Sequence, residues 1–190
     1  MIIQCDTRQK KKHHTTKEEY FLSQGHILKN FGMVVGDYQI LGKGDIVVDT
    51  KANIAELYGN LIQDHDRFHR ECVLAMDAGV KLYILVENTD GIKNISEVSK
   101  WVNPQNYKYF KSCRELTGVR TGRDKNGKSN FYQVFIVAKD KNIKLPKPPC
   151  ENSHLIKVMN TMHTEYGVEF IFCSPKESGA KVLELLTQKQ

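Results

Sequence analysis

Apolar residues along the chain follow two different spacings. Short continuous or alternating apolar runs, which are typical of strands, fall at residues 1–5, 33–41, 45–51, 80–87 and 168–173. Apolar positions that recur every three or four residues predict helices over 15–31, 54–78, 95–101, 153–166 and 175–186. The order is β-α-β-β-α-β, then an interruption, then α-β-α. It predicts an α/β fold with a mixed central β-sheet flanked by helices.

Local signals mark the expected ends of these helices. Thr15-x-x-Glu18 has the spacing of a capping box, so a helix is expected to begin at Thr15. A break is expected near Asp64 in the long helical stretch, and Gly79 and Gly167 are expected to end the helices that precede them.

Residues 103–150 interrupt the pattern. They are basic, rich in Asn and Tyr, and end in LPKPP at 145–149, which predicts a stiff linker. Residues 131–137 alternate like a strand, and DKNG at 124–127 suits a hairpin turn. We therefore expect a single domain over residues 1–190, with an insertion at 103–150 that contains a basic β-hairpin.

Composition narrows the class of protein. The longest apolar runs have five residues, whereas a membrane-spanning helix needs about 20, and the first residues do not form a signal peptide. A cytoplasmic protein is expected. The five cysteines are widely spaced and include no CxxC pair, so reduced thiols are expected and a disulfide framework or zinc ribbon is not. The net charge of +6 and the pI near 9.0 favour a polyanionic partner such as nucleic acid.

Charged residues occupy two neighbouring predicted strands where apolar residues would be usual. Asp49 and Lys51 are two residues apart, so they project from the same face of their strand. If the two strands form a hairpin, Asp37 lies near them. Carboxylates are suitable ligands for Mg²⁺, which polarises a phosphodiester and activates water, and a lysine can neutralise charge in the transition state.

These residues belong to a longer series of motifs. It runs through DTRQ at 6–9, GDYQIL at 36–41, VVDTK at 47–51, DRFHRE at 66–71 and LVEN at 85–88. The series resembles the nuclease domain of the XPF-type structure-specific endonucleases, a PD-(D/E)xK group with a restriction-endonuclease-like fold. The resemblance covers residues 1–90 and 153–188 and suggests a compact bacterial or phage relative.

The resemblance implies a function and a set of site residues. It implies a Mg²⁺-dependent DNA endonuclease, with Mn²⁺ as a substitute, selective for branched or flap DNA and working as a homodimer. Asp37 and Asp49 match the metal ligands, and Lys51 matches the catalytic lysine. Asp6 and Arg8 match catalytic residues at the rim of the site. The remaining matches are Glu56 as a further metal ligand and Arg67 as a DNA-binding residue.

The chain departs from the family pattern in several places. Thr50 replaces the central Arg of the strand motif, Gln9 replaces Glu, Glu71 replaces Gln, and Glu56 comes one residue late. No tandem helix-hairpin-helix motif is expected within residues 1–190. The changed strand motif at Thr50 and the late Glu56 leave open an alternative function, namely a non-catalytic DNA-binding or scaffold module with a degenerate nuclease site.

Two basic stretches are candidate contacts for DNA phosphates, because such contacts are electrostatic and independent of sequence. One follows the first strand and the other surrounds the predicted hairpin turn. Together with Arg67, the candidate DNA-binding residues are Lys10, Lys11, Lys12, Arg120, Arg123, Lys125 and Lys128.

Two other motifs suggest different chemistry. Residues 122–129 satisfy the Walker A pattern, but that motif requires a preceding apolar strand and a following helix. The flanking residues are instead polar and strand-like, so no nucleotide cofactor is expected. His65-Asp66-x-x-His69 imitates a zinc-protease helix, but no third ligand is evident.

Overall fold

The computed structural model describes residues 1–8, 11–120 and 129–188 and divides into two compact units. Unit 1 comprises Met1–Trp101 and Asn152–Gln190, and unit 2 comprises Val102–Glu151. The described part of the chain has no helix that is both apolar enough and long enough to cross a membrane.

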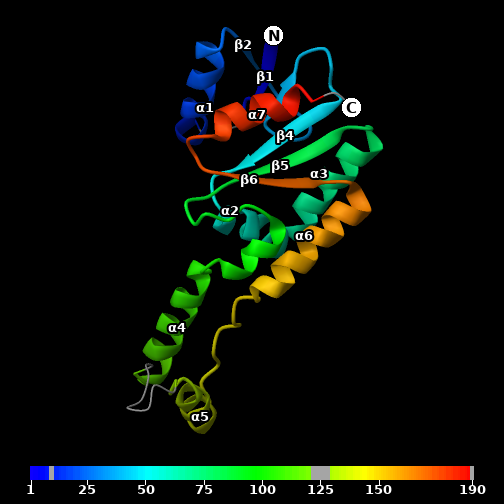
Figure 1. Cartoon of the computed structure of the whole chain (residues 1–190). Helices are drawn as coiled ribbons and strands as arrows, with labels where there is room; N and C mark the ends of the chain where they lie inside the picture. The colour runs from blue at the N-terminus through cyan, green and yellow to red at the C-terminus, as the bar shows by residue number, and fades with distance from the viewer. Residues whose placement is uncertain (9–10, 121–128, 189–190) are drawn as a thin grey trace. The chain divides into compact units, whose positions relative to one another are not determined.

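Unit 1 is built on a six-stranded mixed sheet with the strand order β2-β1-β3-β4-β5-β6 (Figure 1). β3 runs antiparallel to both of its neighbours, and the other adjacent pairs are parallel. The strands are β1 (Ile2–Asp6), β2 (Ile27–Phe31), β3 (Tyr38–Ile40), β4 (Ile46–Lys51), β5 (Lys81–Glu87) and β6 (Glu169–Cys173).

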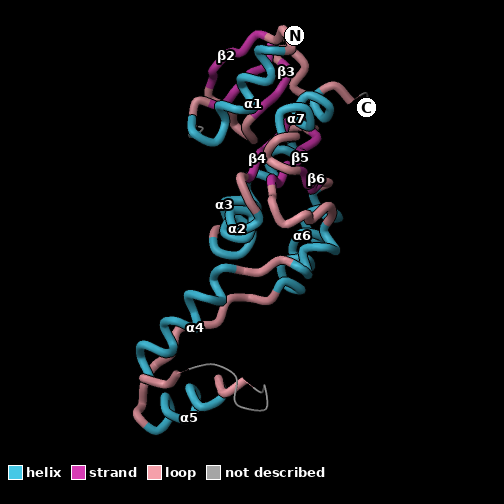
Figure 2. The backbone as a smooth tube through the Cα atoms, turned by 60° about the vertical axis from the view of Figure 1, so that its left-hand side comes forward, coloured by secondary structure: helices cyan, strands magenta, loops and turns pink. Residues whose placement is uncertain are grey.

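Helices cover the sheet. α1 and α7 contact each other, and α7 lies against β3, β4 and β5, whereas α2, α3 and α6 contact β4, β5 or β6 (Figures 1 and 2). The helical elements of unit 1 are α1 (Lys11–Ser23), α2 (Ile54–Tyr58), the π-helical turn η1 (Gly59–Gln63), α3 (His65–Asp77), the 3₁₀ helix η2 (Ile95–Lys100), α6 (Asn152–Tyr166) and α7 (Ser178–Leu186). This architecture confirms the predicted α/β fold.

The main apolar cluster joins the middle of the sheet to α1 and α7. Tyr38 and Phe21 are fully buried, and their rings meet edge to face with centroids 5.4 Å apart. Val182 of α7 and Leu85 of β5 belong to the same cluster. This packing fixes the central strands, which carry the charged residues singled out in the sequence.

The prediction of a helix over 15–31 is wrong at both ends. α1 begins at Lys11, before Thr15, and ends before Gly25, whose φ of 76° suits glycine. The residues Ile27–Phe31 form β2, which pairs in parallel with β1. β2 is an edge strand and mostly exposed, so it lacks the apolar alternation that reveals a strand. The strand expected over 33–41 is also shorter, since only Tyr38–Ile40 is extended in the sheet.

Unit 2 is helical where a β-hairpin was predicted. It contains α4 (Pro104–Thr117) and α5 (Tyr132–Asp140). Asn103 caps α4, because its side chain accepts a hydrogen bond from the Gln105 amide at 2.9 Å. The predicted strand over 131–137 is wrong: Val134 and Ala138 are buried at helical spacing in α5. The predicted turn at 124–127 lies outside the described residues.

The backbone at Gly36, just before β3, packs closely against β4. Its φ is 65°, and a Cβ atom there would lie 2.3 Å from Val47 Cγ1. Gly36→Ala should therefore lower the free energy of unfolding by about 2–5 kcal/mol, combining left-handed backbone strain with overpacking. Chemical denaturation measures this value.

A matched control separates the two causes. Gly42 also has a positive φ, 86°, but a Cβ atom there would have nothing within 4 Å. Gly42→Ala should cost only about 1–2 kcal/mol, the strain alone. Equal costs at the two positions would contradict the close approach at Gly36.

Candidate functional site

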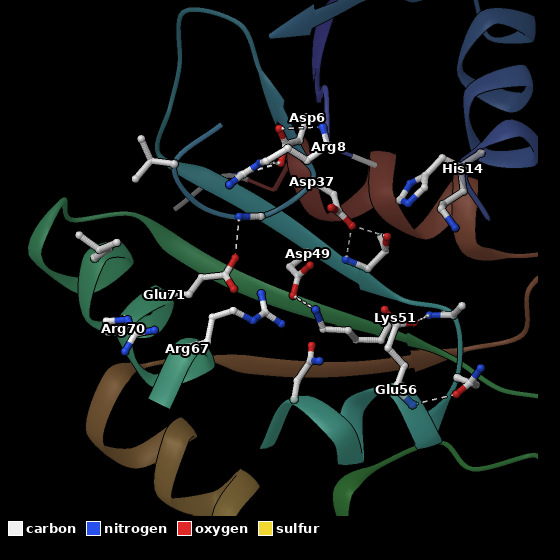
Figure 3. Close-up of a pocket in the computed structure, with 18 residues that line it drawn as sticks. Asp6, Arg8, His14, Asp37, Asp49, Lys51, Glu56, Arg67, Arg70 and Glu71 are labelled. Carbon is white, nitrogen blue, oxygen red and sulfur yellow. Dashed lines mark hydrogen bonds and ion pairs between the residues drawn. The ribbon is translucent and has the colours of Figure 1, made fainter. Parts of the chain in front are cut away.

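The strand order brings three acidic residues to one edge of the sheet. β1 and β4 end there and β3, which lies between them and runs the other way, begins there. The Asp6 amide donates to the Asp37 carbonyl at 3.0 Å, and the Asp37 amide donates to the Val48 carbonyl at 2.9 Å. A pocket of about 780 Å³ opens at this edge and is lined by Asp6, Asp37 and Asp49 (Figure 3).

Asp49 and Lys51 form a buried ion pair at the end of β4. Lys51 Nζ lies 2.5 Å from Asp49 Oδ2. Lys51 is 6% exposed and Asp49 is 5% exposed. Among the described residues, the Asp49 Oδ2 atom has no partner other than this ammonium. The prediction that the two side chains share one face of the strand is confirmed.

Burial and charge set the protonation of this pair. Burial raises the pKa of Asp49 to about 6, and the Asp37 charge adds to the rise while Lys51 opposes it. Burial by itself would lower the pKa of Lys51, but the Asp49 carboxylate holds that pKa above its usual value. Lys51 is therefore a protonated ammonium at neutral pH and supplies positive charge rather than a base.

Thr50, which stands where the resembling strand motif has Arg, holds the neighbouring carboxylate. Its amide donates to Asp37 Oδ2 at 2.8 Å, and its hydroxyl donates to the same oxygen at 2.5 Å. The side chain of Asp37 is thereby fixed beside β4 (Figure 3). The threonine at this position thus supplies a contact within the site.

Asp6 and Arg8 lie in the pocket as a linked pair. Asp6 accepts hydrogen bonds from the Arg8 side chain at 2.8 Å and from the Met33 amide at 3.2 Å. Burial would raise the pKa of Asp6, but the bonds from Arg8 and Met33 lower it overall. The Arg8 guanidinium also donates to the Met33 carbonyl. Asp6 therefore remains ionised, with both oxygens engaged within the protein.

Glu56 closes a capping box at the start of α2. Its Oε2 accepts from the Ala52 amide and its own amide donates to Asn53 Oδ1, each at 2.8 Å. Glu56 lines the pocket, but the described residues contain no group of three His, Cys, Asp or Glu side chains placed to hold one metal ion. The structure therefore does not gather Glu56 with Asp37 and Asp49 into one ligand set.

Glu71 lines the pocket, a role that was not predicted from the sequence. It accepts a hydrogen bond from the Gly36 amide at 3.0 Å, so it supports the backbone next to Asp37. Burial raises its pKa, and the Asp49 charge raises it further. Its position one helical turn after Arg67, which also faces the pocket, was the available signal.

Two further buried pairs beside the pocket were not anticipated. The Lys17 ammonium pairs with the Glu87 carboxylate, and His14 Nδ1 lies 2.6 Å from the Tyr38 hydroxyl. Both α1 residues line the pocket. His14 precedes the predicted helix start at Thr15, whereas α1 begins at Lys11. Lys17 lies in a basic stretch, which suggested contact with DNA phosphates rather than a buried ion pair.

The predicted DNA-binding residues fall in several places. Arg67 lines the pocket and pairs with Asp64 at 2.5 Å, and Arg120 is exposed in unit 2. Lys11 and Lys12 lie in the first turn of α1. Lys10, Arg123, Lys125 and Lys128 lie outside the described residues.

The structure around the Walker A pattern and the His65–His69 pattern does not support nucleotide or zinc binding. The Walker A pattern follows the helix α4 rather than a strand, and most of it lies outside the described residues. The rings of His65 and His69 stack with centroids 6.1 Å apart, and His69 Nε2 lies 2.7 Å from the Tyr166 hydroxyl. No third metal ligand joins these two histidines within the described residues.

The raised pKa of Asp49 predicts a specific titration. In metal-free buffer, the Asp49 carboxyl should titrate near pH 6, about two units above an ordinary Asp. Since the folded pKa exceeds the unfolded one, this group's contribution to stability is full below about pH 4 and is lost as the pH rises through 6. Carboxyl-carbon NMR of aspartate-labelled protein measures the midpoint. A midpoint below pH 4 would contradict the burial of this group.

Comparison with known proteins identifies the fold. No protein-family model and no curated protein matches the chain. Among solved structures, XPF from Aeropyrum pernix matches with a TM-score of 0.53 and 12% identity, over 98% of this chain and 63% of that one. XPF from Aeropyrum pernix in complex with DNA matches with a TM-score of 0.51 and 12% identity, over 97% and 62%. The chain thus spans less than two thirds of these structures, and it has the XPF-like, restriction-endonuclease-like fold that the sequence resemblance predicted.

Proposed function

We propose that the chain is a metal-dependent endonuclease that hydrolyses phosphodiester bonds in DNA. The observation that carries this proposal is the buried Asp49–Lys51 ion pair beside Asp37, at the edge where three strands meet. A buried charged cluster that opens into a pocket is unusual outside functional sites. Its place in an XPF-like fold supports phosphodiester hydrolysis over other chemistry.

Asp37 and Asp49 would hold Mg²⁺, or Mn²⁺ in its place. Mg²⁺ is commonly bound by one or two carboxylates together with waters and substrate phosphates, so these two residues fit the ion without a third protein ligand. The fit rests on Asp49 Oδ2, a buried carboxylate oxygen that has only the Lys51 ammonium as a partner among the described residues. When bound, the ion supplies Lewis-acid activation of a phosphate and of water.

The chain's own side chains would do the remaining work. The Lys51 ammonium would neutralise charge that develops on the phosphate, because its partner keeps it protonated. Thr50 and Glu71 would keep Asp37 and the adjoining backbone in place. Arg8 and Arg67 would bind flanking phosphates at the rim of the pocket. Asp6 would position Arg8, and Glu56 would contribute through water to the metal's outer shell.

Substrate form and assembly are finer parts of the proposal. By the sequence resemblance, the substrate would be branched or flap DNA and the active protein a homodimer. The XPF structure in complex with DNA supports DNA as the partner. Since this chain spans less than two thirds of that structure, the selectivity for branched DNA rests on the resemblance alone.

One observation favours a different function, a non-catalytic DNA-binding module. Glu56 is engaged in a capping box, and the described residues provide no three-ligand metal group. A chain whose site is degenerate would bind DNA but would neither bind Mg²⁺ at Asp49 nor cleave. The two functions therefore make opposite predictions about metal binding.

Cleavage assays test the proposal directly. Wild-type protein should cut labelled duplex, flap, fork or junction DNA with Mg²⁺ or Mn²⁺ and not with EDTA. Lys51→Met and Asp49→Asn should each lower the rate at least ~10²-fold. Lys43→Met is the matched control, because Lys43 is exposed in the turn at the opposite end of β4 and should leave the rate unchanged. Metal-dependent cutting that persists in Lys51→Met would contradict the assignment.

Thermal melting tests metal binding separately from cleavage. Mg²⁺ should raise the melting temperature at pH 7.5, because a ligand that binds only the folded state stabilises it. The rise should shrink at pH 5, where Asp49 is protonated and a proton competes with the metal. Asp49→Asn should abolish the shift. A shift that is equal at both pH values, or that survives in Asp49→Asn, would place the metal elsewhere.

A further inference from the structure

Unit 2 carries the whole positive excess of the chain. Its fifty residues, 102–151, contain eleven Lys and Arg and four Asp and Glu. Unit 1 therefore has 17 basic and 18 acidic residues of the chain's 28 and 22. The formal charges are +7 for unit 2 and −1 for unit 1. A polyanion is therefore attracted to unit 2 rather than to the protein as a whole.

Aromatic side chains join the two helices of unit 2 in one continuous ridge. Phe110 of α4 meets Phe131 edge to face with ring centroids 4.8 Å apart, and Phe131 meets Phe135 of α5 in the same way at 5.3 Å. The ring centroids of Tyr109 and Phe131 lie 5.9 Å apart. We call these four residues the aromatic ridge. Phe110 and Phe135 remain 42% and 51% exposed, so the ridge presents ring surface to solvent.

Basic residues continue the same helix faces. Phe131 at the N-cap of α5, and Phe135 and Lys139 within the helix, follow one another at four-residue intervals and so share a face. On α4, Arg114 lies four residues after Phe110. Arg114 is half-buried and Lys139 is exposed. Each helix face that carries a ring of the ridge therefore continues into a basic residue.

We infer that this surface of unit 2 binds single-stranded nucleic acid, with the aromatic ridge stacking on unpaired bases and the cations contacting phosphates. Proteins that bind single strands combine these two features, because every unpaired base offers a flat face for stacking. The bases of a duplex are already stacked on one another and offer no such face. The inference deepens the proposed nuclease function, on which it rests for its biological meaning, because it names an unpaired strand as part of the substrate.

Fluorescence anisotropy of the full chain in EDTA tests the inference without cleavage. Wild-type protein should bind a labelled 20-nucleotide thymidine strand more tightly than a 20-base-pair duplex. Phe110→Leu/Phe135→Leu, which keeps apolar bulk but removes two rings, should weaken single-strand binding roughly fivefold or more and change duplex binding less than about twofold. Ile136→Ala, at a 52% exposed residue of α5 outside the ridge, should change neither. Circular dichroism of each variant checks that α4 and α5 remain folded.

Charge variants separate stacking from electrostatics. Arg114→Ala/Lys139→Ala should weaken the binding of both single-stranded and duplex DNA and reduce the salt dependence of single-strand binding by about 0.7 per lost phosphate contact. Equal loss of single-strand and duplex binding in the Phe variants would overturn the inference. So would concentration-dependent self-association that these variants abolish with no effect on DNA binding. If cleavage fails while the Phe-dependent single-strand preference remains, the nuclease proposal falls and the binding surface stands.

Discussion

The buried ion pair between Asp49 and Lys51 is the constraint that organises the site. Neither charge is tolerated alone at this depth, since removing one partner of a buried pair typically costs about 3–5 kcal/mol. The pair nevertheless keeps Lys51 protonated while burial raises the pKa of Asp49. A buried ion pair is often no more stabilising than a well-packed apolar pair, and under the proposed function this one has a role in the chemistry at the pocket.

The sheet topology places other acidic residues beside this ion pair. β3 runs antiparallel between β1 and β4, so residues far apart in the sequence converge at one edge. The strands themselves place Asp6 beside the Asp37 backbone. Two hydrogen bonds from Thr50 then hold the Asp37 carboxylate. The close approach at Gly36 and the support from Glu71 complete this geometry. The site therefore depends on strand register rather than on mobile loops.

The central part of this arrangement could be predicted from the sequence. The two-residue spacing of Asp49 and Lys51 determines their common face, and apolar runs reveal the buried strands β4 and β5.

Other elements could not be predicted, and each failure has a physical cause. The edge strand β2 lacks a buried face, so its pattern looked helical. α5 contains β-branched and aromatic residues that also suit a strand, and only tertiary packing of Val134 and Ala138 decides for the helix. The contacts of Thr50 and Glu71 are made with Asp37 and Gly36, which are distant in the sequence. The spacing of Glu71 from Arg67 indicates a shared helix face but not these partners.

The most direct test of the account is to locate a metal ion in the pocket. Crystals of the protein with Mn²⁺ and a short oligonucleotide should show an anomalous peak about 2.0–2.3 Å from carboxylate oxygens of both Asp37 and Asp49, beside a phosphate within reach of Lys51. A phosphate in the pocket without any metal at these carboxylates, or a metal bound at other residues only, would contradict the assignment of this edge of the sheet as a metal-dependent nuclease site.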